Sequence, residues 1–331
     1  WVESHLPKHS IMATNVDDIR KQAAIYNGVL ENEEVRAEVK AAVGNMFSPS
    51  TLEVYAQCPF RFLGERIWKQ SEFIEKEELA APTDMGTLVH ECLAKFLGKH
   101  LQEKLPKYDF AVLWKDLKQE FQNLCDEYIA NGKLLQNELW GAEQKRLLNM
   151  LHKWLRYEYD MQGKWDFVPC AVEWAFNNKE GAPLRLKLED GQKFAIMGRV
   201  DRIDKNGDKV FVTDYKLGSV PAVDDLPNGV DLQLPIYLLA ANKLYGKEVA
   251  GGGYLSMKEG KRKNNVKLDA SQEFPFMDKK SKDHFANIED RWLAFKESSE
   301  KLLCNYVQGI YDGNFNVQQM KKCNSYCALR D

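Results

Sequence analysis

Two aspartates and a lysine, Asp201, Asp214 and Lys216, stand at a spacing that suits metal chemistry. Asn206-Gly207 lies between the two aspartates, and Asn-Gly is the strongest short-range signal for a hairpin loop of two residues. Because side chains alternate between the faces of a strand, such a hairpin places both aspartates on one face as diagonal neighbours, about 7–8 Å apart at the backbone. Lys216 lies on the same face. The sequence therefore predicts two carboxylates that can reach one cation, with an amine beside them.

Converging carboxylates suit Mg²⁺ or Mn²⁺, which are hard cations that take oxygen ligands. A cation bound there would polarise a phosphoryl oxygen and lower the pKa of a bound water, as attack on a negatively charged phosphodiester requires. Lys216 would orient or help deprotonate that water and offset the charge that builds up in the transition state. The alternative interpretation is a surface hairpin with a structural cross-strand pair of Asp and Lys.

The elements that must position this hairpin are strands in the middle of the chain and helices towards both ends. In the predicted register Asp201 lies opposite Val212, and Asp214 lies opposite Arg199. Runs rich in β-branched and aromatic residues predict strands over residues 168–176, 184–188, 194–203, 209–216 and 249–257. Helical apolar spacing predicts helices near residues 48–63, 84–96, 109–130, 135–161, 231–245 and 282–311, with a basic loop after residue 257. This order indicates an α+β fold.

Composition excludes several classes of protein. The 331 residues carry 46 Lys and Arg against 49 Asp and Glu, a net charge of −3, with 44% apolar and 29% charged residues. No run approaches the roughly 18 apolar residues of a membrane span, so neither membrane insertion nor wholesale disorder is expected. A near-neutral chain would have to hold nucleic acid through a local patch or metal ions. Seven cysteines and no secretory leader argue against a complete disulfide framework, and we expect a cytoplasmic protein.

The arrangement of Asp201 with Asp214-Tyr215-Lys216 resembles the core of the PD-(D/E)XK nucleases, specifically the RecB-like branch found in bacterial helicase-nucleases. The resemblance runs from Ser48 onward and implies a restriction-endonuclease-like α+β fold, with a central mixed sheet flanked by helices. We therefore expect a helical lead-in over residues 1–47 and a nuclease domain over residues 48–331, with a helical insertion at about 105–163. Trp1 and Asp331 are expected to bound a domain of a larger protein.

The segment from Gly86 to His90 is similar to the helix-borne histidine motif of this family. The resemblance implies that His90 is a third metal ligand beside Asp201 and Asp214, and that the Tyr215 carbonyl adds an oxygen ligand. The small Gly86 shares a helix face with His90 and would let that face approach the sheet closely. Without the motif, a lone helical histidine would be interpreted as structural.

Three further residues match the family pattern. Glu173, on the strand before the hairpin, corresponds to an acid that faces the site in family members, and a solvated glutamate is the alternative. Gln233 and Tyr237 resemble a helical Gln-x-x-x-Tyr motif and share one helix face, so an amide and a phenol can point towards the site or a DNA phosphate. Tyr237 would otherwise be interpreted as a core aromatic.

Cys58, Cys323 and Cys327 resemble the cysteines that hold a 4Fe-4S cluster in AddB-type nucleases. The match is incomplete, because the late pair has three residues between its cysteines where the family usually has fewer. A fourth ligand is expected just beyond Asp331, or Cys304 substitutes for it. The remaining cysteines are expected in the core: Cys92, Cys125 and Cys170.

Basic residues in two segments are expected to contact DNA phosphates: Arg61, Arg66 and Lys69 after Cys58, and Lys258, Lys261, Arg262 and Lys263 after the last predicted strand. A merely solvated charged loop is the alternative. No Gly-x-x-x-x-Gly-Lys-Ser/Thr motif occurs, so a helicase motor is expected in another part of the polypeptide or in a partner subunit.

The resulting hypothesis is a metal-dependent DNA nuclease that acts on single strands or duplex ends delivered by a helicase, in end processing, recombination and repair. The alternatives are a catalytically weak DNA-binding or scaffolding module, and a restriction-type endonuclease that acts on a specific sequence. The restriction-type alternative fits the core but not the Gln233 and Tyr237 helix or the cysteines.

Overall fold

The computed structural model describes residues 28–70, 82–134, 138–177, 179, 181–222, 224–277 and 288–317. The chain divides into two compact units. One, which we call the terminal unit, comprises Trp1–Gly44, Val54–Ser71 and Tyr306–Asp331. The other, which we call the sheet unit, comprises Asn45–Glu53 and Glu72–Asn305 and contains the whole predicted hairpin.

The described part of the terminal unit is helical. Its elements are α3 (Glu33–Val43), the end of α4 (Pro49–Gln57), α5 (Pro59–Phe62), the π-helical turn η1 (Leu63–Ile67) and the end of α10 (Arg291–Tyr311). Asn32 caps α3 by accepting hydrogen bonds from the first backbone N–H groups of the helix. Tyr55 packs edge-on against Phe62 and donates a hydrogen bond to the carbonyl of Asn314. Aromatic packing thus joins segments of this unit that are far apart in the sequence.

The sheet unit is built on a five-stranded mixed sheet with the order β2-β5-β6-β7-β8. Its strands are β2 (Val168–Phe176), β5 (Gly198–Asn206), β6 (Lys209–Lys216), β7 (Glu248–Ser256) and β8 (Lys261–Lys267). β6 and β7 are parallel, and the other neighbours are antiparallel. Parallel neighbours need a crossover connection, and α9 (Gln233–Tyr245) lies in the one between β6 and β7.

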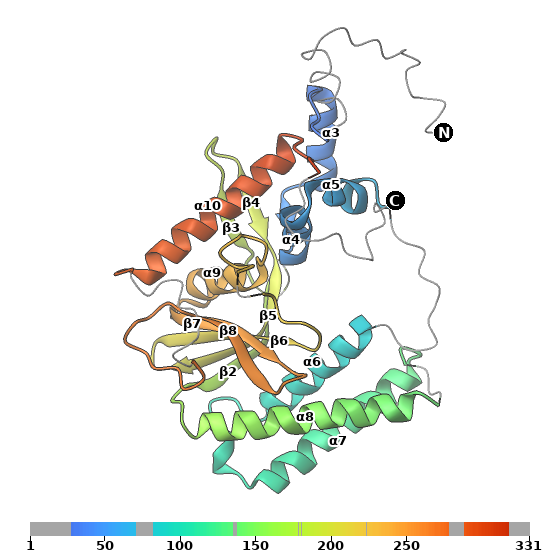
Figure 1. The fold of residues 1–331 in the computed structure, drawn as a ribbon, viewed down its shortest axis with the longest axis vertical. Helices are drawn as coiled ribbons and strands as arrows, with labels where there is room; N and C mark the ends of the chain where they lie inside the picture. The colour runs from blue at the N-terminus through green and yellow to red at the C-terminus, as the bar shows by residue number, and fades with distance from the viewer. Residues whose placement is uncertain are drawn as a thin grey trace. The chain divides into compact units, whose positions relative to one another are not determined.

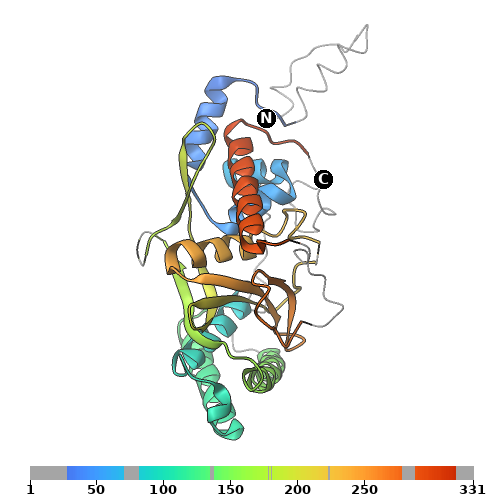
Figure 2. The same cartoon turned by 90° about the vertical axis from the view of Figure 1, so that its left-hand side faces the viewer.

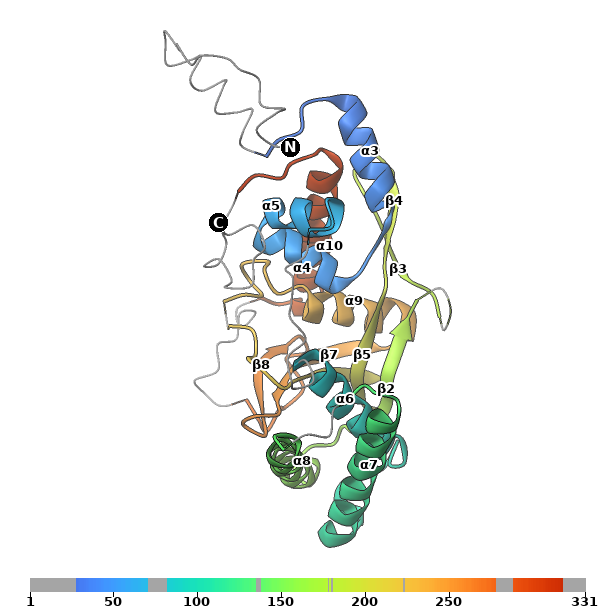
Figure 3. The ribbon, with the colours of Figure 1, turned by 90° about the vertical axis from the view of Figure 1, so that its right-hand side faces the viewer.

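Helices cover both faces of this sheet. Figure 1 and Figure 3 show α9 on one face and α6 (Pro82–Gly98) and α8 (Trp140–Gln162) on the other, with α7 (Phe110–Ala130) beside them, and Figure 2 shows the same layers from another side. The buried side chains of α6, α7 and α8 form one core with Tyr215, Leu255 and Met257 of the sheet side. The predicted α+β fold, a mixed sheet flanked by helices, is confirmed.

A smaller sheet has the order β1-β4-β3. Its strands are β1 (Met46–Phe47), β4 (Lys193–Ile196) and β3 (Leu184–Lys187), and a short 3-10 turn, η2 (Leu105–Lys107), precedes α7. The strand predicted over residues 194–203 is therefore two strands, β4 and β5, that belong to different sheets. The interruption falls at Met197, before Gly198.

The hairpin between β5 and β6 has a different register from the predicted one. Asn206 pairs with Lys209, so the loop is Gly207-Asp208 and the ladder is shifted by two residues. Gly207 has φ +58, as a type II′ turn requires at its first central position. The prediction that Asp201 lies opposite Val212 is wrong, since Val212 pairs with Ile203. A shift of two residues preserves the faces, because side chains alternate with period two.

Residues 261–267 were expected to form a basic loop, but they form the edge strand β8. Lys-Arg-Lys-Asn-Asn-Val-Lys lacks the alternation that predicts a strand, and the pairing with β7 decides the conformation. The last helix is described from Arg291 to Tyr311, and the predicted start at residue 282 lies outside the described residues. Within the described ranges, every helix is too short or too polar to cross a bilayer.

Candidate metal centre and active site

Three carboxylates lie in one row across the sheet. The β2–β5 register sets Glu173 opposite Asp201. The β5–β6 register, continued by one residue, sets Asp201 opposite Asp214. Residues opposite each other on neighbouring strands project to the same face. The two aspartates are therefore direct neighbours where the sequence predicted diagonal ones, and Glu173 joins them.

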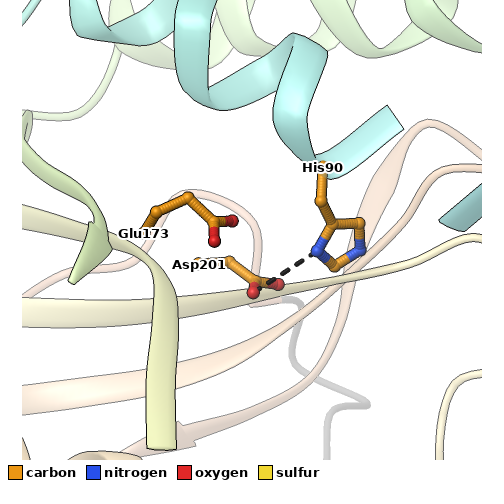
Figure 4. Close-up of side chains that lie close together, drawn as sticks. All are labelled: His90, Glu173 and Asp201. Atoms are coloured by element: carbon orange, nitrogen blue, oxygen red, sulfur yellow. Dashed lines mark ion pairs between the residues drawn. The ribbon is translucent and has the colours of Figure 1, made fainter. Parts of the chain in front are cut away.

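His90 reaches this row from α6. Its Nδ1 lies 3.4 Å from Oδ1 of Asp201, and Figure 4 shows the imidazole directed at that carboxylate with the Glu173 carboxylate close by. Ligand atoms of His90, Glu173 and Asp201 all lie within 4.8 Å of one another. One imidazole nitrogen with two carboxylate oxygens is a donor set that fits a divalent cation.

The acids around His90 control its protonation. Burial opposes the charged imidazolium, but the hydrogen bond to Asp201 and the negative charges of Asp201, Asp214 and Glu173 outweigh burial and raise the pKa of His90 to about 9. The same negative charges attract a cation. Proton and metal compete here, because a histidine binds metal through its neutral imidazole.

Glu173 carries backbone strain inside β2. Its φ is +48, in the left-handed region that costs a residue other than glycine about 1–2 kcal/mol. Burial and the neighbouring charge of Asp201 raise the pKa of the Glu173 carboxyl. Arg199 Nη1, 3.5 Å from Oε2, provides the nearest compensating charge. Backbone strain at residues other than glycine is common at functional sites, and Glu173 carries such strain beside two other acids.

Asp214 is the most deeply buried of the three acids, with a side chain 1% exposed. Burial and the charge of Asp201 raise the pKa of Asp214 to about 7, against the opposing effect of Lys216. Oδ2 lies 2.8 Å from Lys216 Nζ. Apart from this ion pair, neither carboxylate oxygen accepts a hydrogen bond from the described residues. A buried oxygen without a donor, here Oδ1, is what a metal-binding carboxylate leaves open.

Tyr215 orients Asp201 through its backbone. The Tyr215 N–H donates a hydrogen bond to Asp201 Oδ2 at 2.7 Å, which leaves Oδ1 directed at His90. The Tyr215 hydroxyl lies on the opposite face of the sheet and bonds Arg202 at 3.3 Å. The predicted metal-binding role of the Tyr215 carbonyl stays a prediction.

Lys216 is held by α9 as well as by Asp214. Its Nζ donates to Gln233 Oε1 at 2.5 Å, and Gln233 Nε2 donates to the Tyr237 hydroxyl at 2.9 Å. The amide of Gln233 therefore fixes the lysine and is itself fixed by the phenol one helical turn later. Of the Gln-x-x-x-Tyr pattern, Gln233 contacts the predicted lysine directly, and Tyr237 supports it through Gln233.

Glu53, which the sequence analysis did not single out, anchors this side of the site. Its Oε1 accepts hydrogen bonds from the backbone N–H groups of Leu232 at 3.1 Å and Gln233 at 3.0 Å, at the start of α9. Burial raises the pKa of Glu53, although these hydrogen bonds oppose the shift. No local pattern marks this residue, because its partners lie about 180 residues away in the sequence.

Four of the seven basic residues predicted to contact DNA phosphates have different surroundings. Lys261 is exposed and pairs with Glu259 at 3.3 Å. In the terminal unit, Arg66 is exposed and Arg61 pairs with Glu65 at 2.5 Å.

Arg262 does not fit its predicted role. Its side chain is 1% exposed, lies 3.4 Å from Glu158 and stacks over the ring of Trp165. The alternation of β8 turns this arginine inward, where its charge is compensated by acids of the core. It cannot reach a phosphate at the surface.

The predicted role of Gly86 in α6 was to let the helix approach the sheet closely. A Cβ at Gly86 would meet nothing within 4 Å, so the predicted close approach of this helix face to the sheet is wrong at that position.

Cys58 is a free, half-buried cysteine at the start of α5. Cys323 and Cys327 lie outside the described residues. Cys92 and Cys125 are buried as predicted, whereas Cys170 and Cys304 are only partly so.

The sequence of the chain is similar to those of known proteins. A sequence model described as the PD-(D/E)XK nuclease superfamily matches residues 46–331. The chain is similar to an ATP-dependent helicase/deoxyribonuclease subunit from Carboxydothermus hydrogenoformans, with 30% identity over 290 residues that cover 83% of this chain and 26% of that protein. The protein of the same name from Clostridioides difficile is 29% identical over 223 residues, 63% of this chain and 18% of that protein. The chain thus spans about a quarter or less of the length of these relatives.

Proposed function

The chain belongs to the PD-(D/E)XK nuclease superfamily, and from this membership we propose that it is a metal-dependent nuclease domain that hydrolyses phosphodiester bonds of single-stranded DNA. The observation that carries the proposal is the row of Glu173, Asp201 and Asp214 beside His90 and Lys216. We assign the nuclease domain to residues 48–331, with a helical insertion at about 105–163.

The ligand atoms of His90, Glu173 and Asp201 lie together and would hold Mg²⁺ or Mn²⁺. Asp214, opposite Asp201 in the β5–β6 ladder, is the further ligand that we propose from the sequence. When bound, the cation polarises a phosphoryl oxygen and lowers the pKa of a water. Three carboxylates alone would repel a DNA phosphate, so the site needs compensating positive charge before DNA can enter.

The chain's own residues then act on the water and the phosphate. Asp214 and Gln233 fix the Lys216 amine from two sides. A fixed ammonium can orient the attacking water and offset the negative charge that develops on the phosphoryl oxygens. Because the ammonium is already in place, little reorganisation is needed when the phosphate arrives.

The helicase connection rests on the relatives, whose names include both a helicase and a deoxyribonuclease activity. This chain corresponds to a minor part of their length and contains no P-loop motif. We infer that a motor outside this segment, or in a partner subunit, delivers single strands to the site for end processing, recombination and repair.

The test measures degradation of end-labelled single-stranded DNA by the wild-type chain and by Asp214→Asn and Lys216→Ala. The wild type should cleave with Mg²⁺ and stop on chelation, and both variants should lose cleavage by roughly 100-fold or more while they unfold at unchanged temperatures. Asp208→Asn, at the exposed turn of the same hairpin, is the matched control and should cleave normally. Persistent cleavage by the purified Asp214→Asn variant would contradict the assignment of this site as the nuclease active site. Binding of DNA by a wild type that never cleaves would favour the scaffolding alternative.

A further inference from the structure

A cavity of about 990 Å³ opens directly beyond the proposed catalytic lysine. We call it the β6 groove. It lies within the sheet unit, between α8, residues 217–222 after β6, and residues 256–264 around the β7–β8 turn. Leu217 follows Lys216 in the chain, and Ser256 pairs with Lys216 in the β6–β7 ladder; both residues line the groove. The groove therefore begins one residue from the site.

The charge of the groove is positive. Its lining includes Arg146, Lys153, Lys258 and Lys263 against one acid, Glu259. Arg146 is paired with Glu143, and Lys263 is paired with Glu259. Lys153 and Lys258 are exposed and have no acidic partner among the described residues. Two uncompensated cations at a concave surface attract an anionic chain.

The walls of the groove are held by contacts that need no ligand. Gly260, with φ +64, packs so closely on α8 that a Cβ there would lie 3.1 Å from Cβ of Lys153. The side-chain amide of Asn264 donates to the carbonyl of Pro221 and ties β8 to the segment after β6. The groove is therefore preformed, which lowers the entropic cost of binding.

We propose that the β6 groove holds the backbone of a DNA single strand next to the bond that is cut, with Lys153 and Lys258 on its phosphates. This inference rests on the proposed nuclease function. Apolar side chains in the same lining, those of Met150, Leu217 and Val220, favour a single strand. An unpaired strand offers apolar sugar and base surfaces between its phosphates, whereas a duplex buries its base faces.

The test compares the double variant Lys153→Ala/Lys258→Ala with the wild-type chain. Binding of a labelled oligothymidylate is measured at several salt concentrations in EDTA, where no cleavage occurs. Losing two phosphate contacts should weaken binding at low salt by roughly three- to tenfold. It should also lower the slope of log affinity against log salt by about 1.4, since each single-strand contact contributes about 0.7.

The matched control is Lys115→Ala/Lys118→Ala on α7, which removes the same charge from exposed positions outside the groove. It should leave the salt slope unchanged. An unchanged slope in the groove variant, an equal loss in the control, or equally tight binding of poly-glutamate by the wild type would each overturn the inference. If the double variant fails to unfold cooperatively, Lys258→Gln alone carries the same comparison, with half the effect.

Cleavage of DNA by the wild-type chain with Mg²⁺ distinguishes a failure of this inference from a failure of the nuclease proposal. Cleavage with an unaltered slope in the groove variant rejects the groove alone. A reduced slope in the groove variant, with no cleavage by the wild type, supports the groove as a DNA site and rejects the nuclease function. A wild type that binds no oligothymidylate rejects the groove directly.

Discussion

At the scale of single residues, the site depends on a chain of positioning contacts that begins outside the recognised motifs. Glu53 holds the start of α9, Gln233 at that start holds Lys216, and Lys216 contacts Asp214. Each link is a hydrogen bond or ion pair to the next. Glu53 touches none of the proposed metal ligands and acts as a positioning residue.

Glu53→Ala removes the acceptor of two backbone N–H groups at a helix start, which should cost about 1 kcal/mol of unfolding free energy. It should also lower single-turnover cleavage roughly tenfold by releasing Gln233 and Lys216, with little change in DNA affinity. Glu53→Gln keeps an oxygen acceptor and should restore most of both. Thermal unfolding and single-turnover kinetics measure the two effects. Equal cleavage by Glu53→Ala and the wild type would show that Glu53 does not position the lysine.

At the scale of elements, α9 can position its residues only because a glycine in β7 allows the helix to pack close to the sheet. A Cβ at Gly252 would lie 2.8 Å from Cδ2 of Leu238 in α9 and 3.1 Å from the carbonyl oxygen of Val212 in β6. Only glycine fits between the helix and the strand without a shift. The distance between helix and sheet, and hence the reach of Gln233 to Lys216, is set at this contact.

Gly252→Ala should therefore destabilise the chain by about 1–3 kcal/mol and reduce cleavage, because overpacking displaces α9 from the sheet. Denaturant unfolding and cleavage rate are the measurements. Gly141→Ala in α8 is the control: a Cβ there meets nothing within 4 Å, and alanine favours a helix, so stability should hold or rise slightly. Normal cleavage and stability in Gly252→Ala would contradict the close packing.

At the scale of the whole molecule, the two units divide the predicted functions. The carboxylate row, the lysine, Glu53 and the β6 groove all belong to the sheet unit, and Cys58 belongs to the terminal unit. The predicted iron–sulfur ligation therefore concerns a different part of the chain from the proposed chemistry, and separate variants can test the two.

Iron content and visible absorbance of anaerobically purified full-length protein test the cluster. We expect iron and a broad visible absorbance, because thiolates suit iron. Both should be lost in Cys58→Ser and retained in Cys170→Ser, whose half-buried thiol contacts the hydroxyl of Tyr245 at 3.4 Å. Full-length wild type without iron, or Cys58→Ser with its iron retained, would remove the cluster from the description of this protein.

Much of the fold could be predicted from local patterns. The helices α7 and α8 and the strands β2, β6 and β7 lie within a few residues of their predicted positions, because apolar spacing and β-branched runs report directly on local structure. The faces of Asp201 and Asp214 were also predictable, since alternation survives a shift of two residues. The register of the hairpin was not predictable, because Gly207 occupies the first position of the turn and Asn206 therefore belongs to the strand.

By itself, the sequence determined which residue types could do chemistry and which strand face they share, because side-chain alternation is a property of the local backbone. The tertiary structure alone decided which distant residues meet. It brought Glu53 to the start of α9, buried Arg262 among acids of the core, and enclosed a cationic groove beside Lys216. These outcomes depend on packing between segments far apart in the chain, and no local pattern encodes such contacts.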